Sequence, residues 1–160
     1  MKKDYKKSEQ DGGSNVAYAP RYTSTLDKKM NEQLKHYEDK LRYEIDSWDL
    51  NESVKNGESV IIVDTRSKEA YKFEHIKGAI NLPHKDMTEE RIKEFGQEYL
   101  YVTYCDGIGC NASTKGARNL LKLGFQVKEL MGGIEWWKRD GHSTEGTNAS
   151  PGSDSNCGCG

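Results

Sequence analysis

The chain has 160 residues, a formal net charge of −2 and a mean hydropathy of −0.93. This length fits one ordinary domain with tails, and the nearly balanced charge gives no reason to expect nucleic acid or an anionic membrane as a partner. No stretch approaches the roughly 20 apolar residues of a membrane span, and the N-terminal lysines are not followed by the apolar segment of a secretory signal. Four cysteines without an export signal favour free thiols in a reducing cytoplasm.

The distribution of apolar residues predicts four regions. Residues 1–20 form a disordered N-terminal tail and residues 143–160 a flexible C-terminal tail, because both are rich in Gly, Ser, Asn, Asp and Lys. Residues 21–40 form an amphipathic helix, and residues 41–142 form the folded domain. The C-terminal tail ends in Cys157-Gly158-Cys159-Gly160, a mobile pair of thiols that could relay sulfur, form a disulfide, bind a soft metal or remain idle.

The helix of residues 21–40 begins at a cluster of capping residues, Thr23-Ser24-Thr25. Its apolar residues recur at helical spacing and form one stripe: Leu26, Met30, Leu34, Tyr37 and Leu41. We expect this stripe to pack against the protein's own domain, with a partner-binding helix as the alternative.

Strands and helices then alternate along the chain. The patterns predict strands at 41–45, 59–63, 78–82, 99–104 and 125–130, and helices at 46–54, 67–73, 88–95, 112–123 and after 133. This alternation predicts an α/β fold with a mostly parallel central sheet and helices on both faces. In such sheets, reactive groups collect at the carboxyl ends of the strands.

Cys105 carries the strongest chemical signal in the sequence. It follows the strand of residues 99–104, precedes a glycine-rich loop and lies shortly before the helix that begins at residue 112. Free backbone amides and a helix N-terminus attract anions and lower the pKa of a thiol. We therefore expect Cys105 to be partly exposed on the floor of a pocket, with a lowered pKa. The loop amides of Asp106, Gly107, Ile108, Gly109, Cys110 and Asn111 are expected to face its sulfur.

Other readings of this loop are less consistent with the sequence. Residues 107–112 match the pattern G-x-G-x-x-A, but a dinucleotide site normally opens a larger sheet, and about one strand follows here. A phosphatase loop would carry an arginine that binds the phosphoryl oxygens, whereas the nearest following arginine is Arg118 inside the helix. The four cysteines lack regular zinc-ligand spacing, so we expect no metal. Asp64 and Arg66 follow the strand of residues 59–63 and are expected to form a supporting ion pair at the same edge of the sheet.

Several motifs resemble the rhodanese-like, single-domain sulfurtransferase family over about residues 45–141. The first half is carried by residues 61–66 (IIVDTR) and 75–83 (HIKGAINLP), and the second half by Tyr104-Cys105, residues 123–125 (LGF) and residues 131–137 (MGGIEWW). The loop after Cys105 is about two residues longer than is common in the family, has no basic residue and contains Cys110. Glu74 stands where the family usually has Gly before the histidine.

The resemblance implies a mechanism and a set of partners. Cys105 would take sulfane sulfur from a thiosulfate- or persulfide-type donor, hold it as a persulfide within the loop of residues 106–111, and pass it to a thiol or cyanide. The partners would be a small sulfur donor and a thiol acceptor, which could be a protein thiol, and no cofactor is implied. Two alternatives stay open: a thiol redox protein that uses Cys105 and Cys110, and a non-catalytic regulatory module of the same fold.

Overall fold

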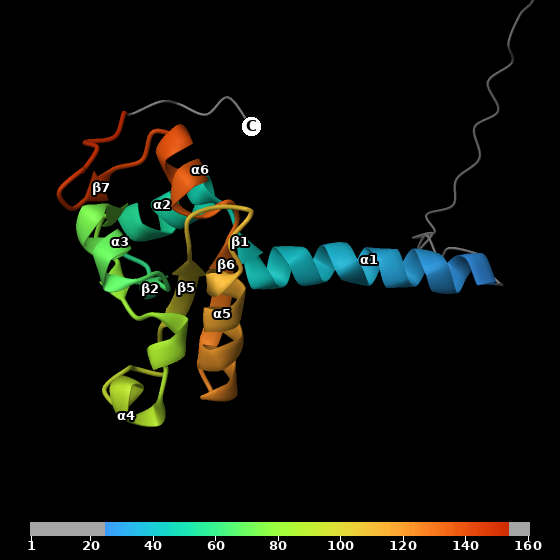
Figure 1. Cartoon of the computed structure of the whole chain (residues 1–160). Coiled ribbons are helices and arrows are strands. Elements are labelled where there is room, and N and C mark those ends of the chain that lie inside the picture. The colour runs from blue at the N-terminus through green and yellow to red at the C-terminus, as the bar shows by residue number, and fades with distance from the viewer. Residues whose placement is uncertain (1–24, 154–160) are drawn as a thin grey trace, which may run out of the picture. The chain divides into compact units, whose positions relative to one another are not determined.

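The computed structural model describes residues 25–153 (Figure 1). A boundary between two compact units falls after Leu34, and the fold described below belongs to the second unit, from Lys35 onward. The expected N-terminal tail and the cysteines at 157 and 159 lie outside the described residues. Among the helices described, none is both long and apolar enough to cross a membrane.

Five parallel strands form the central sheet, as the alternating pattern predicted. Their order is β1-β6-β5-β2-β4, so the strand that ends before Cys105 is in the middle. The strands are β1 (Glu44–Ile45), β2 (Val60–Asp64), β4 (Ile80–Asn81), β5 (Leu100–Tyr104) and β6 (Gln126–Leu130). Continuous apolar runs in β2 and β5 suit strands whose two faces are both covered.

Alternate residues of the central strands enter two separate hydrophobic cores. On one face, Ile62 and Val102 pack with residues of α2 (Ser47–Lys55), α3 (Lys68–Phe73) and α6 (Gly133–Arg139). On the other face, Val63 and Tyr101 pack with residues of α4 (Glu89–Ile92) and α5 (Ala112–Lys122). A short 3-10 helix, η1 (His84–Asp86), precedes α4. Helices therefore cover both faces of the sheet, which confirms the expected fold class.

The N-terminal helix differs from the prediction in length and packing. α1 (Thr25–Tyr43) continues through most of the expected strand at 41–45 and leaves only two residues for β1. Within the second unit, Tyr37 and Leu41 are exposed, so the expectation that the apolar stripe packs on the domain is wrong for these two residues. Helix-favouring charged residues and an i,i+4 ion pair between Lys40 and Glu44 favour helix over strand here.

The expectation of a flexible tail from residue 143 is wrong for residues 143–153. β7 (Thr144–Glu145) pairs antiparallel with β3 (His75–Ile76). Backbone amides of Thr147 and Asn148 then donate to the carbonyls of Lys72 and Phe73 at 3.1 and 2.8 Å. Polar composition predicted disorder, but this segment is ordered by hydrogen bonds to the α3–β3 corner rather than by apolar burial.

Candidate active site around Cys105

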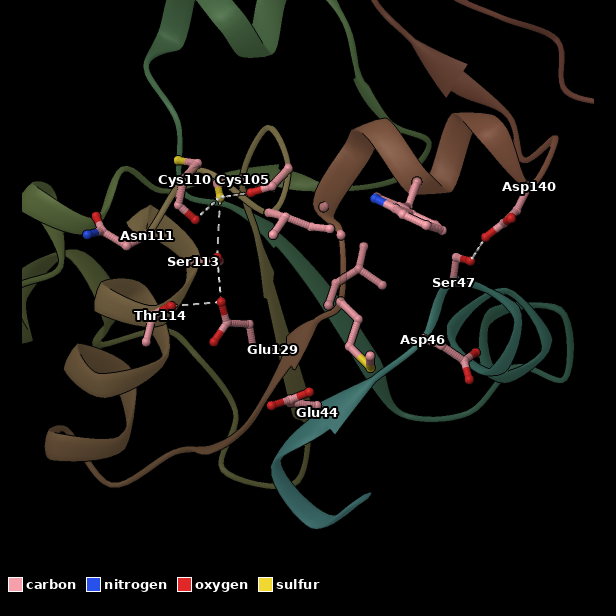
Figure 2. A pocket seen from close by; sticks show the side chains of 17 residues that line it. Glu44, Asp46, Ser47, Cys105, Cys110, Asn111, Ser113, Thr114, Glu129 and Asp140 are labelled. Carbon is pink, nitrogen blue, oxygen red and sulfur yellow. Dashed lines mark hydrogen bonds between the residues drawn. The ribbon is translucent and has the colours of Figure 1, made fainter. Parts of the chain in front are cut away.

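Cys105 lies at the carboxyl end of the central strand β5, where the sequence placed it. Its side chain is 1% exposed, so the prediction of partial exposure is wrong. The residue still forms part of the wall of a cavity, together with Cys110 and Asn111 of the loop that follows it (Figure 2).

The orientation of the loop also differs from the prediction. The Cys105 Sγ donates to the carbonyl oxygen of Cys110 at 3.0 Å and lies 3.8 Å from that of Gly107. At these two positions carbonyl oxygens, and not amides, face the sulfur. The Cys110 amide instead closes a turn by donating to the Gly107 carbonyl at 3.0 Å. In this conformation the loop accepts a hydrogen bond from the neutral thiol.

The electrostatic environment of the sulfur follows from this geometry. Burial raises the pKa of the Cys105 thiol above its ordinary value, and the neighbouring Cys110 adds to the rise. The hydroxyl and the backbone amide of Ser113 lower this pKa without reversing the rise. The expected lowering of this pKa is therefore wrong for this conformation, since desolvation outweighs the donors at the start of α5.

Ser113 and Glu129 extend the site and were not predicted as site residues. The Ser113 Oγ lies 3.3 Å from the Cys105 Sγ and donates to Glu129 Oε1 at 2.7 Å. Thr114 donates to the same carboxylate oxygen at 2.8 Å. A carboxylate is thus two hydrogen bonds away from the sulfur (Figure 2). Glu129 lies near the carboxyl end of β6, beside β5. The sequence signal that could have identified it was this position at the carboxyl end of a predicted strand, where reactive groups collect.

The first turn of α6 fixes the backbone on either side of the thiol. The amides of Ile134 and Glu135 donate to the carbonyls of Cys105 and Asp106, both at 3.0 Å. Gly133 makes this approach possible: its φ is 59°, and a Cβ atom there would lie 2.3 Å from the Cys105 carbonyl oxygen. The segment of residues 131–137, noted as a family motif, therefore supports the loop that holds Cys105.

The cavity beside Cys105 has a volume of about 660 Å³. Its walls come from β1 and the start of α2, the loop after β5, the start of α5, the end of β6 and the helix α6. The lining residues are Glu44, Asp46, Ser47, Cys105, Gly107, Ile108, Cys110, Asn111, Ser113, Thr114, Glu129, Leu130, Met131, Gly132, Gly133, Trp136 and Asp140. Asp106 and Gly109, two of the predicted loop residues, are not among them.

Asp64 and Arg66 form the expected ion pair, which connects the end of β2 to the loop after β5; we call this set of contacts the Arg66 brace. The Asp64 carboxylate is fully buried and accepts from the Arg66 guanidinium at 2.7 Å and from the Tyr104 hydroxyl at 2.6 Å. Arg66 also donates to Asp106 Oδ1 at 2.9 Å and to the Glu74 carbonyl at 2.6 Å. Burial alone would lower the pKa of Arg66, but the hydrogen bonds and charge of Asp64 raise it. The Arg66 guanidinium is occupied by these contacts, and Arg66 does not line the cavity.

Two residues of the first family motif region, His75 and the preceding Glu74, take structural roles. His75 stacks on Tyr71 with ring centroids 3.8 Å apart, and its Nδ1 hydrogen-bonds the Tyr71 carbonyl oxygen at 2.7 Å. Glu74 is buried and accepts from Lys138 at 2.6 Å and Thr144 at 2.9 Å, so it holds the C-terminal segment. Cys105 and Cys110 are both free thiols. Within residues 25–153, no group of three or more His, Cys, Asp or Glu side chains is placed to bind a metal.

The fold and the site together define an α/β protein with a buried thiol at the end of its central strand, next to a cavity. A family model described as "Rhodanese-like domain" matches residues 48–140. The chain therefore belongs to the rhodanese-like domain family.

Known proteins resemble the chain over much of its length. The BH2092 protein of Bacillus halodurans has a crystal structure that is 43% identical, with a TM-score of 0.72, over 78% of this chain and 91% of that one. Thiosulfate sulfurtransferase GlpE of Coxiella burnetii is 32% identical over 65% of this chain and 91% of its own length.

A third relative is a much longer protein. The probable molybdopterin-synthase adenylyltransferase of Porphyra purpurea is 36% identical over 59% of this chain. The match spans only 25% of that protein, so the likeness concerns a quarter of its length and not its whole activity.

Proposed function

We propose that the protein is a sulfurtransferase in which Cys105 carries sulfane sulfur as a persulfide. The observation that carries this proposal is the position of Cys105, at the carboxyl end of the central strand and in the wall of a 660 Å³ cavity. A cavity of this volume is in the range that accepts small molecules. Membership in a family that includes relatives named thiosulfate sulfurtransferase supports the same reaction class.

The reaction divides into two nucleophilic displacements at sulfur. The Cys105 thiolate attacks the outer sulfur of a thiosulfate- or persulfide-type donor, the donor's sulfur–sulfur bond breaks, and its remainder leaves as sulfite or a thiolate. A thiol or cyanide then attacks the outer sulfur of the Cys105 persulfide and releases the Cys105 thiolate. No cofactor enters either step. The proposal places the reaction in the cytoplasm, where thiols are kept reduced.

Ser113 is the side chain best placed to assist the first step. Its hydroxyl and its backbone amide are the two groups whose hydrogen bonds lower the pKa of Cys105, against the larger effect of burial. The Ser113 hydroxyl now donates to Glu129, and turning it toward the sulfur would stabilise the thiolate. The persulfide stage also requires the loop to present amides in place of the carbonyls of Gly107 and Cys110. Gly109 has open space around its Cα and leaves the loop free to turn.

A redox function is the second candidate, and the position of Cys110 favours it. Cys110 lines the same cavity as Cys105, five residues later along one loop, and both thiols are free. A redox protein would close a disulfide between them in its working cycle. That step requires the two Cα atoms to come within about 4.4–6.8 Å with their Cβ atoms facing each other.

Intact-mass analysis after treatment with thiosulfate or a small persulfide separates the two functions. A sulfurtransferase gains one sulfur atom on Cys105, loses this gain in Cys105→Ser and keeps most of its turnover in the matched variant Cys110→Ser. Equal loss of turnover in both variants, with a Cys105–Cys110 disulfide in the wild type, would favour the redox function instead.

A further inference from the structure

Among the described residues, every charged side chain that lines the Cys105 cavity is acidic. The four carboxylates are Glu44, Asp46, Glu129 and Asp140, and no Lys or Arg of the described residues lines this cavity. A wall of one charge sign in a partly closed site focuses its potential on whatever enters.

In the part of the chain that the structure describes, most of these carboxylates lack a neutralising cation. Among residues 25–153, only Glu44 has one, Lys40 at 2.5 Å. Glu129 accepts from two hydroxyls and Asp140 from the hydroxyl of Ser47, all neutral donors. Asp46 accepts from a backbone amide at the start of α2. Over residues 25–153, no Lys or Arg nitrogen lies within 4.0 Å of Asp46, Glu129 or Asp140, so the cavity keeps a net negative charge.

The backbone places two of these charges side by side. Glu44 on β1 and Glu129 on β6 are register partners in adjacent parallel strands (Figure 2). Like charges at neighbouring positions repel each other, and here only Glu44 has a cation, Lys40, among the described residues. Two carboxylates placed side by side next to the thiol do not stabilise the sheet, so they are more consistent with a role in the site.

Other groups near the sulfur add to the negative potential of the cavity. The carbonyl oxygens of Gly107 and Cys110 face it, adding the negative ends of two dipoles. Ile108, Met131 and Trp136 are apolar, exposed and part of the cavity lining, Ile108 by 78%.

We propose that this cavity selects a positively charged sulfur substrate, namely a thiol or persulfide with an ammonium or guanidinium group near its sulfur. This inference rests on the proposed sulfur transfer for its substrate, although the charge selection itself is a property of the cavity. In the transfer step, the cationic acceptor's thiolate attacks the outer sulfur of the Cys105 persulfide. The bond between the two sulfurs breaks, Cys105 leaves as a thiolate, and the acceptor becomes the persulfide. A doubly negative donor such as thiosulfate is disfavoured by the same charges.

The first arm of the test does not depend on sulfur transfer. Wild-type protein is treated with two methanethiosulfonate reagents of similar size, one bearing trimethylammonium and one bearing sulfonate, and Cys105 labelling is followed by peptide mass spectrometry. We compare the ratio of the two labelling rates with that of the triple variant Asp46→Asn/Glu129→Gln/Asp140→Asn. Asparagine at 46 keeps the helix cap. Glu69→Gln, on α3 and outside the cavity lining, is the matched control.

We expect the cation-to-anion ratio to fall at least about 10-fold in the triple variant, which corresponds to about 1.4 kcal/mol. The control should keep the wild-type ratio, and added salt should reduce the wild-type ratio. If the cation-to-anion ratio of the triple variant stays within about twofold of the wild-type ratio, the inference is overturned, whether or not the protein transfers sulfur.

The second arm identifies the substrate. Protein loaded with sulfur from a neutral persulfide is offered cysteamine, 2-mercaptoethanol or 3-mercaptopropionate, and kcat/KM is measured for each. Comparing variant with wild type cancels the intrinsic reactivity of each thiol. We expect the triple variant to lose its preference for cysteamine, and a short peptide with arginines beside a cysteine tests whether a protein segment supplies the same charge. An unchanged preference overturns the assignment. Charge-selective labelling without any persulfide would instead refute the sulfurtransferase function and leave the cavity's selectivity standing.

Discussion

Replacing Arg66 by methionine tests whether the Arg66 brace holds the fold together. The substitution keeps an unbranched side chain but removes the guanidinium from Asp64, Asp106 and the Glu74 carbonyl. The Asp64 carboxylate, fully buried, is then left without a cation. Removing one partner of a buried ion pair costs about 3–5 kcal/mol.

The lower end of this range applies here. Asp64 still accepts hydrogen bonds from the Arg66 backbone amide at 2.9 Å and from the Tyr104 hydroxyl at 2.6 Å, and these offset part of the loss. We therefore expect Arg66→Met to lower the free energy of unfolding by about 3 kcal/mol. For a domain of this size, that corresponds to a fall in Tm of roughly 10 °C.

Urea unfolding followed by tryptophan fluorescence measures the change, since Trp137 is buried in the core. Arg139→Met is the matched control: the ion pair of Arg139 with Glu135 is exposed on both sides and should contribute less than about 1 kcal/mol. If the two variants lose the same small amount of stability, the buried pair does not brace the site and the reasoning fails.

Three further outcomes are expected. Because burial raises the pKa of Cys105, its rate of alkylation by iodoacetamide should keep rising with pH beyond about 8.5, and Ser113→Ala should shift the curve to still higher pH; a plateau near neutral pH would contradict both. Ending the chain at residue 142 instead of residue 153 should lower the free energy of unfolding by on the order of 3 kcal/mol, because the hydrogen bonds to β3 and α3 are lost. Equal urea midpoints for the two chains would show that residues 143–153 contribute nothing to stability. Gly133→Ala should lower Tm strongly, since its Cβ would overlap the Cys105 carbonyl, whereas Gly109→Ala, in open space, should leave Tm nearly unchanged in the same thermal scan.

The central sheet could be predicted because its longer strands carry their signal locally. The runs at 60–64 and 100–104 are apolar and rich in β-formers, and each is followed by polar or glycine-rich residues. β3 and β7 were not predicted because, unlike β1 and β4, these two-residue strands do not lie within a longer alternating or apolar run, and their pairing joins segments far apart in the sequence. The polar composition of residues 143–153 predicts disorder for the same reason: the partners that order this segment are far away in the sequence.

The thiol's position could be predicted, but its surroundings could not. A strand followed by a glycine-rich loop identifies Cys105, yet the sequence does not determine which way each peptide unit of the loop turns. Carbonyls face the sulfur at Gly107 and Cys110, and this depends on backbone angles that glycine leaves open. The acidic cavity could not be predicted either, since its carboxylates come from three separate segments, at residues 44–46, 129 and 140, that only the strand register and the last helix bring together.

The contact between α6 and the loop after β5 has a consequence for biosynthesis. Ile134 and Glu135 provide the two amides that hold the carbonyls of Cys105 and Asp106, and both follow the last strand of the central sheet in the chain. A ribosome therefore releases the thiol and its loop well before the residues that fix them. During that interval the nascent chain carries Cys105 without its finished cavity, and the site is completed only when the first turn of α6 docks.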